Sequence, residues 1–141
     1  MSRLFLDSSV LFSAIYSSAG AARELLRLAL RGEVHLILSH DVVTETRRNL
    51  GRKAPELVPL MERLLLQIPF EVAANPLKEE VWAAEAYVNP KDALIIAAAI
   101  QARPDYLTTL DRKHLIDPPE VAERSGLTIL TPGDALRKLR G

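Results

Sequence analysis

The sequence contains no cysteine among its 141 residues. This absence excludes disulfide bonds, thiolate catalysis and cysteine-type zinc sites, and it is compatible with a reducing compartment. An excess of charge is also missing, because 18 lysine and arginine residues balance 18 aspartate and glutamate residues. A balanced chain is not drawn as a whole to nucleic acid or to anionic membranes, so any such binding requires a local basic patch.

Aromatic residues and long apolar runs are scarce. Aromatic residues make up 5% of the sequence and are dispersed, so the sequence shows no base-stacking surface. The longest apolar stretch, from Ala93 to Ile100, is too short to span a bilayer. The apolar run at the N-terminus is interrupted by Asp7, and no small-residue cleavage pattern follows it. We therefore expect a cytoplasmic protein with no membrane contact.

What is present is the composition of an ordinary globular protein. Hydrophobic residues account for 48% of the sequence and charged residues for 26%, and there is no repeat or low-complexity tract. The length is close to the commonest size of one compact domain. We expect residues 1–141 to form a single domain.

Short apolar segments alternate with amphipathic segments along the chain. Strands are expected over residues 3–6, 34–38, 69–73, 105–111 (strand, then loop) and 127–130. Helices are expected from about residue 10, over 21–31, from 40 to beyond 50, over 55–66, 77–87, from 90 onward, and over 132–139. Ser39, Asn89 and Thr131 are the expected N-caps of three of these helices. Strands that alternate with helices favour an α/β fold, in which a parallel sheet is covered on both faces.

Four acidic residues fall on one edge of this expected sheet. In a parallel α/β sheet the carboxyl ends of the strands and the amino ends of the following helices share one edge, where ligands usually bind. Most other acids fall on wet helix faces or have helix-capping explanations. The four are Asp7 after the first strand, Glu45 in the second turn of a helix, Asp92 in the first turn of another, and Asp111 after the fourth strand.

Such a cluster predicts a cation site. Carboxylates that lie within a few ångströms of one another repel, and at least one takes up a proton unless a cation neutralises the group. Oxygen ligands favour Mg²⁺ or Mn²⁺, since the chain has no thiolates and its three histidines are not grouped at a metal-ligand spacing. One or two such ions can activate a water molecule and stabilise charge on a phosphodiester.

Each acid also has a structural interpretation, and these vary in strength. Asp92 favours the dipole of its own helix, and Asp111 is typical of a turn. Asp7 is a possible cap for a helix near residue 10, although Ser8 or Ser9 would also serve. Taken together the acids favour a metal site. Ser9 either orients a metal-bound water or belongs to the turn.

The stretches "FLDSSVL", "LSHDVVTE", "NPKDALIIAAA" and "LTTLD" occur in an order that resembles the PIN domain, the nuclease fold of VapC-type toxins. The resemblance covers essentially the whole chain and implies a three-layer α/β/α fold, with a mainly parallel sheet of five strands between helices. It also implies that hydrolysis of single-stranded RNA is the reaction, with Mg²⁺ or Mn²⁺ as cofactor. The catalytic metal ligands would be Asp7, Glu45, Asp92 and Asp111. Many relatives carry a further acid where this chain has His114, so the number of metal ions, one or two, stays open.

Basic residues flank the acidic edge. They are candidate contacts for RNA phosphates, or else parts of a solvated surface. The candidates are Arg47, Arg48, Lys91, Arg112 and Lys113. The resemblance further implies the toxin of a type II toxin and antitoxin pair, with an antitoxin protein covering the acidic edge, and it suggests a homodimer.

Two alternatives to a toxin remain open from the sequence. A housekeeping RNA-processing nuclease would show the same residues, and a PIN-like module could bind RNA or protein without cutting. The four intact acids argue against the second alternative. A phosphatase of the haloacid dehalogenase type would need an aspartate at Ser9, and a receiver domain would need adjacent acids after the first strand, so both are disfavoured.

Overall fold

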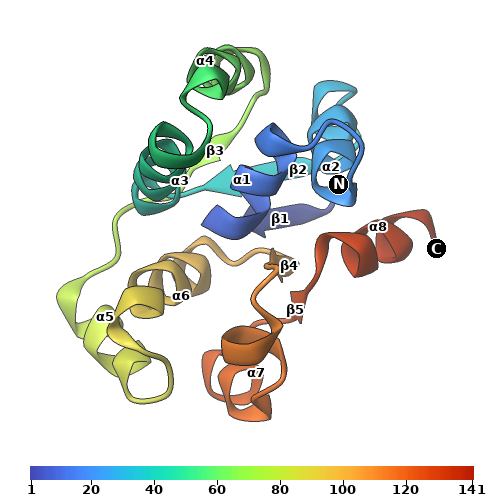
Figure 1. The fold of residues 1–141 in the computed structure, drawn as a ribbon. Helices are drawn as coiled ribbons and strands as arrows, with labels where there is room; N and C mark the ends of the chain where they lie inside the picture. Colours follow the sequence, from blue (N-terminus) through green and yellow to red (C-terminus); the bar gives the residue numbers. More distant parts are fainter.

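The computed structural model describes residues 1–141 and contains one sheet of five strands in the order β3-β2-β1-β4-β5 (Figure 1). The strands are β1 (Arg3–Leu6), β2 (His35–Leu38), β3 (Glu71–Val72), β4 (Tyr106–Thr108) and β5 (Ile129–Leu130). Every neighbouring pair is parallel. The predicted α/β class is confirmed, and the sheet is entirely parallel.

Helices connect the strands and lie on both sides of the sheet (Figure 1). They are α1 (Ser8–Tyr16), α2 (Ala21–Leu30), α3 (His40–Lys53), α4 (Val58–Gln67), α5 (Lys78–Glu85), α6 (Pro90–Ala102), α7 (Pro119–Ser125) and α8 (Pro132–Arg140). A short 3₁₀ helix, Pro55–Leu57, precedes α4, and a π-helical turn, Arg112–Ile116, follows β4. No helix has both the length and the apolar character that a membrane span requires.

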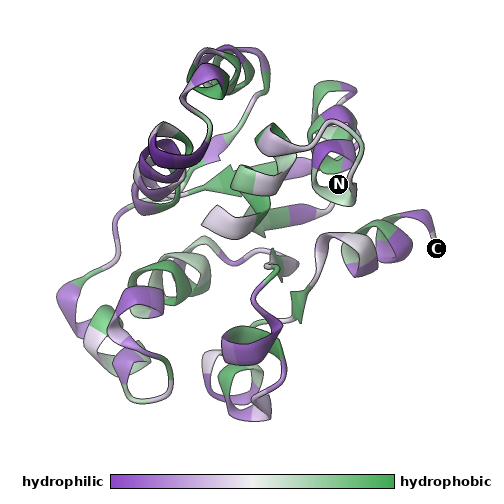
Figure 2. Ribbon diagram, viewed as in Figure 1, coloured by the Kyte–Doolittle hydropathy of each residue, from purple (hydrophilic) through white to green (hydrophobic).

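The hydrophobic core is built around the central strand. Leu4, Phe5 and Leu6 of β1 are fully buried, and Phe5 lies opposite Ile37 of β2 and Leu107 of β4. A strand covered on both faces has no side that requires polar residues, which explains the continuous apolar run. Figure 2 shows hydrophobic residues along the strands and polar residues on the outer helices.

The strand register and the helix caps bring the carboxyl ends of the strands and the starts of the following helices together at one edge of the sheet. Leu6 at the end of β1 pairs with Thr108 at the end of β4, so the next residues of both strands emerge side by side. The side chains of Ser39, Asn89 and Thr131 accept backbone N–H groups at the starts of α3, α6 and α8. These three predicted caps are confirmed, and they fix the first turns of the helices at this edge.

Three local features differ from the sequence predictions. Helix α1 begins at Ser8 rather than near residue 10, because Asp7 is its cap and accepts the Ser8 N–H at 2.7 Å. Ser8 and Ser9 lie within the helix, so of the three residues that could have served as the cap, Asp7 does so. Helix α7 and the π-helical turn were not predicted, since both are too short for helical periodicity to show in the sequence.

Candidate active site at the carboxyl edge of the sheet

The four predicted acids line one cavity of about 220 Å³ at the carboxyl edge of the sheet. They come from four separate parts of the chain, which the parallel register and the helix starts bring together. The lining consists of Asp7, Ser8, Ser9, Glu45, Asn89, Lys91, Asp92, Ile95, Asp111 and His114.

Asp7 is the most deeply buried of the acids, with 6% of its surface exposed. Its Oδ1 accepts the Ser8 N–H at 2.7 Å. Its Oδ2 accepts the hydroxyls of Ser9 at 3.0 Å and Thr109 at 2.7 Å. These three donors offset the loss of water on burial and hold the Asp7 side chain in one orientation.

Ser9 connects the first acid to the loop that carries the fourth. Its Oγ donates to Asp7 and also accepts the Leu110 N–H at 3.1 Å. The predicted supporting residue therefore contacts a candidate ligand directly. The role of Ser9 in orienting a metal-bound water stays a prediction.

Thr109 is a site residue that the sequence reasoning missed. It is fully buried, its hydroxyl donates to Asp7, and its Oγ1 accepts the Asp111 N–H at 3.1 Å. It therefore couples the first and fourth acids through one side chain. The signal was available in "LTTLD", where a threonine stands between the fourth strand and Asp111.

Asp92 lies in the first turn of α6, where its own N–H donates to Oδ1 of Asn89 at 3.1 Å. Burial raises the pKa of Asp92, and the charges of Asp7 and Asp111 raise it further. Asp7 and Asp111 thus act electrostatically on Asp92, as is expected of clustered carboxylates.

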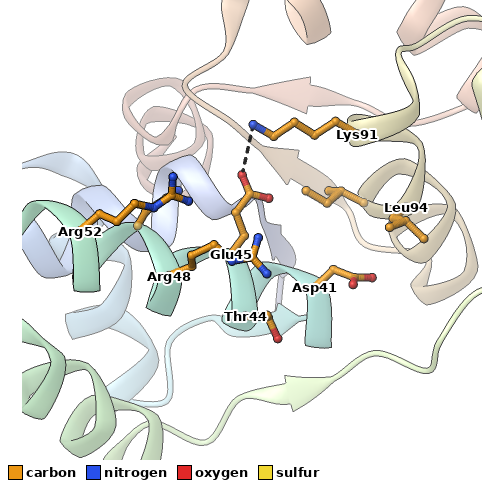
Figure 3. A pocket seen from close by; sticks show the side chains of 9 residues that line it. Asp41, Thr44, Glu45, Arg48, Arg52, Lys91 and Leu94 are labelled. Atoms are coloured by element: carbon orange, nitrogen blue, oxygen red, sulfur yellow. Dashed lines mark hydrogen bonds and ion pairs between the residues drawn. The ribbon is translucent and has the colours of Figure 1, made fainter.

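Glu45 and Asp111 each face a cationic or ionisable partner. Lys91 Nζ lies 3.8 Å from Oε1 of Glu45 and joins α6 to α3 (Figure 3). The His114 N–H donates to Oδ1 of Asp111, and its ring Nδ1 lies 3.1 Å from the same oxygen. Thr46, next to Glu45, is fully buried and its hydroxyl donates to the Val42 carbonyl within α3.

With the side chains in these orientations, no three of the acids and histidines are close enough together to hold a metal ion. The contacts of three of the acids explain why they do not converge on one point. Asp7 is turned toward hydroxyl donors, Glu45 toward Lys91, and Asp111 toward His114. Three of the four carboxylates therefore satisfy partners of their own while they share the cavity with Asp92.

A second cavity adjoins the first between α3 and α6 (Figure 3). Arg48 and Arg52 from α3 and Lys91 from α6 lie around Glu45 in this groove. Neither arginine forms an ion pair with an acid; Arg52 makes one long hydrogen bond, 3.4 Å, to Oδ1 of Asn49. We call this cavity the basic groove; it is lined by Asp41, Thr44, Glu45, Arg48, Asn49, Arg52, Lys91, Leu94 and Ile95.

The other predicted basic residues lie elsewhere. Arg47 forms an ion pair with Glu62 of α4 at 2.9 Å and lines neither cavity. Arg112 and Lys113 are exposed in the π-helical turn and also line neither cavity. Of the five predicted phosphate contacts, the structure brings Arg48 and Lys91 to the acids.

The PIN domain family matches residues 3–113, a range that contains all four acids, and the chain belongs to this family. The resemblance inferred from the four short motifs is therefore confirmed. A search of curated proteins finds no match.

Solved structures share the fold at low sequence identity. PAE2754 from Pyrobaculum aerophilum has a TM-score of 0.68 and 17% identity, over 99% of this chain and 96% of that one. VapBC2 from Rickettsia felis, solved bound to a promoter DNA fragment, has a TM-score of 0.62 and 15% identity, over 90% and 96%. FitAcB from Neisseria gonorrhoeae has a TM-score of 0.62 and 17% identity, over 92% and 98%. At these identities the likeness concerns the fold.

Proposed function

We propose that this protein is a divalent-metal-dependent endoribonuclease that hydrolyses phosphodiester bonds in single-stranded RNA. One observation carries the proposal: in a member of the PIN domain family, four acids from distant parts of the sequence line a single cavity. A purely structural role explains each acid separately, but it gives no reason for repelling charges to gather at one place.

The chemistry of the donors fits Mg²⁺ or Mn²⁺. Carboxylate oxygens are hard ligands, and the cavity contains no thiolate that would favour softer metals. When bound, the ion would supply an activated water and neutralise charge on the phosphate. Asp7 is already fixed by its donors, whereas Glu45 would turn from Lys91, and Asp111 from the ring of His114, toward the ion that Asp92 also faces.

The basic groove supplies the local positive patch that a chain of balanced charge needs to bind RNA. Arg48 and Arg52 have no acidic partner that would have to be displaced by a phosphate, and Lys91 stands where the groove meets the acids. We assign these three side chains to the RNA backbone. Arg47 is excluded from this set because it pairs with Glu62 and lines neither cavity.

The biological setting that we propose is the toxin of a type II toxin and antitoxin pair, acting as a cytoplasmic homodimer. Its support is the family membership and the likeness of the fold to VapBC2 and FitAcB. An antitoxin protein would inhibit by covering the acidic cavity and the basic groove. An RNA-processing nuclease outside such a pair would use the same residues.

The test is cleavage of a mixed pool of single-stranded RNA by purified protein with Mn²⁺, Mg²⁺ or a chelator. Wild type is compared with Asp92→Asn, which keeps the shape of the side chain and removes its charge. Asp134→Asn is the matched control, because Asp134 is also a first-turn acid but lines neither cavity. We expect cutting by wild type and Asp134→Asn only when metal is supplied.

Two other outcomes are informative. Equal cutting by wild type and Asp92→Asn would remove the catalytic assignment, since the activity would not come from this site. Binding of RNA without cutting, in the presence of either metal, would favour the non-catalytic PIN-like module.

A further inference from the structure

A third cavity extends from the acids in another direction, between α1 and α3. It shares Ser8, Ser9 and Glu45 with the acidic cavity, so the two adjoin. Its remaining lining includes two aromatic rings and a lysine. This composition differs from that of the basic groove, where no aromatic residue is present.

The aromatic pair is Phe12 and Tyr16, which lie one helical turn apart on α1. Their rings are stacked, with centroids 5.4 Å apart and planes inclined by 17°. Phe12 packs against the hydrophobic core, whereas Tyr16 is 60% exposed. The partly buried ring therefore holds the exposed ring in a fixed plane, and an exposed flat ring loses little freedom when another ring stacks on it.

Polar and charged groups surround this pair. Lys53 Nζ lies 5.5 Å from the centroid of the Phe12 ring and forms no ion pair with an acid. Ser13 and Asn49 also line the cavity and offer hydrogen-bond donors and acceptors. A flat aromatic surface beside a cation and amide or hydroxyl groups is what an unpaired nucleobase and its phosphate require.

We propose that this third cavity is a nucleobase subsite, in which one unpaired base of the RNA stacks on Tyr16 while Lys53 contacts an adjacent phosphate. The assignment rests on the proposed ribonuclease function. Glu45 lines all three cavities, so the basic groove, the acidic cavity and the cavity of Tyr16 meet around this one side chain. Only an unpaired base can stack in this way, which gives a structural basis for the choice of single-stranded RNA.

The surroundings of Tyr16 favour RNA over a protein partner. The only other strongly exposed hydrophobic residue in this cavity is Leu110, and the rest of the lining includes three serines, an asparagine, a lysine and a glutamate. Protein-docking surfaces need a larger contiguous apolar centre than two side chains provide. Lys53 and the nearby Arg52 also give this end of α3 a positive charge suited to phosphate.

The test measures binding rather than cutting, in an Asp92→Asn background that leaves the RNA intact. The probes are a fluorescent single-stranded oligonucleotide and a series in which one base at a time is replaced by an abasic site. With Tyr16 present, we expect one abasic position to weaken binding by about fivefold or more, the range for loss of one stacked base. Tyr16→Ala should weaken binding of the intact RNA by a similar factor. Its RNA affinity should no longer depend on whether that one position is abasic.

Two controls accompany this measurement. Tyr16→Phe keeps the ring and should bind as the parent does, which separates stacking from any role of the hydroxyl. Trp82→Ala removes another exposed aromatic residue, one that lines none of the three cavities, and should change nothing.

The outcomes distinguish the subsite from the function on which it rests. Equal RNA binding by the parent and by Tyr16→Ala, at every abasic position, overturns the subsite and leaves the ribonuclease proposal standing. Absence of RNA binding by all variants overturns both. A change in oligomeric state on Tyr16→Ala, measured by light scattering, would identify a protein interface instead and would also overturn the subsite.

Discussion

The hydroxyl of Thr109 donates a 2.7 Å hydrogen bond to Oδ2 of Asp7, although the two residues are 102 positions apart in the sequence. They become neighbours because β1 and β4 are adjacent parallel strands that end at the same level. The orientation of the most buried acid is therefore set in part by the residue that follows a different strand. Thr109 acts on the site through Asp7 and is a positioning residue.

Removal of this hydroxyl should impair the site without dismantling the fold. We expect Thr109→Val to lower metal affinity or ribonuclease activity by about 10-fold to 100-fold, the usual effect of losing a partner that orients a metal ligand. Thr109→Ser keeps the hydroxyl and should restore most of the loss. The measurement is the Mn²⁺ dependence of cleavage. Equal dependence in wild type and Thr109→Val would show that Asp7 needs no such support.

Divalent cations should stabilise the wild-type protein. A ligand that binds only the folded state raises the unfolding temperature with its concentration. Thermal unfolding with increasing Mn²⁺ should therefore show a rising Tm for wild type and a much smaller rise for Asp92→Asn. Asp134→Asn, which leaves the cavity unchanged, should behave as wild type. A similar rise in all three proteins would place the cation elsewhere.

Arg48 should contribute to RNA binding more than to the chemical step. Arg48→Ala is expected to raise KM severalfold with little change in kcat. It should also reduce the slope of RNA affinity against salt concentration by the amount that corresponds to about one phosphate contact. Arg63→Ala is the matched control, because Arg63 is an exposed arginine on α4 that lines neither the basic groove nor the acidic cavity. Identical KM values for the two variants would rule out a specific role for the groove.

The amino edge of the sheet, opposite the edge that carries the four acids, offers a pH-dependent test of stability. Glu71 of β3 contacts Arg3 of β1 and His35 of β2, each at 2.8 Å. The hydrogen bond from Arg3, followed by that from His35, lowers the pKa of Glu71 below its usual 4.5. This stabilisation is present above pH 4.5 and is lost as pH falls through the lowered folded value.

We expect Glu71→Gln to reduce the free energy of unfolding at pH 7 by up to about 1 kcal/mol, the upper end for a partly exposed ion pair. The difference in the free energy of unfolding between the variant and wild type should disappear at acidic pH, where Glu71 is protonated in both the folded and the unfolded state. Denaturant unfolding across a pH series measures this. Glu56→Gln, an exposed acid without an ion pair, should show no such difference.

Much of the fold was readable from local sequence. The caps Ser39, Asn89 and Thr131 were predictable because a short polar side chain before an apolar periodic run satisfies free N–H groups wherever it occurs. The cap of α1 stayed open among Asp7, Ser8 and Ser9, because "DSS" offers three residues of nearly equal capping strength. The register of the strands, which the sequence does not encode locally, decided among them.

The sequence by itself determined which residue types were available: four acids after strands or at helix starts, no thiolate, and an α/β alternation that directs those acids to one edge. Only the tertiary structure decided which side chains meet. It turned Arg47 toward Glu62 and Arg48 toward the acids, and it stacked Phe12 with Tyr16 beside them. The physical reason is that helix rotation and strand register arise from packing of the whole core, while capping and periodicity arise from neighbours in the chain.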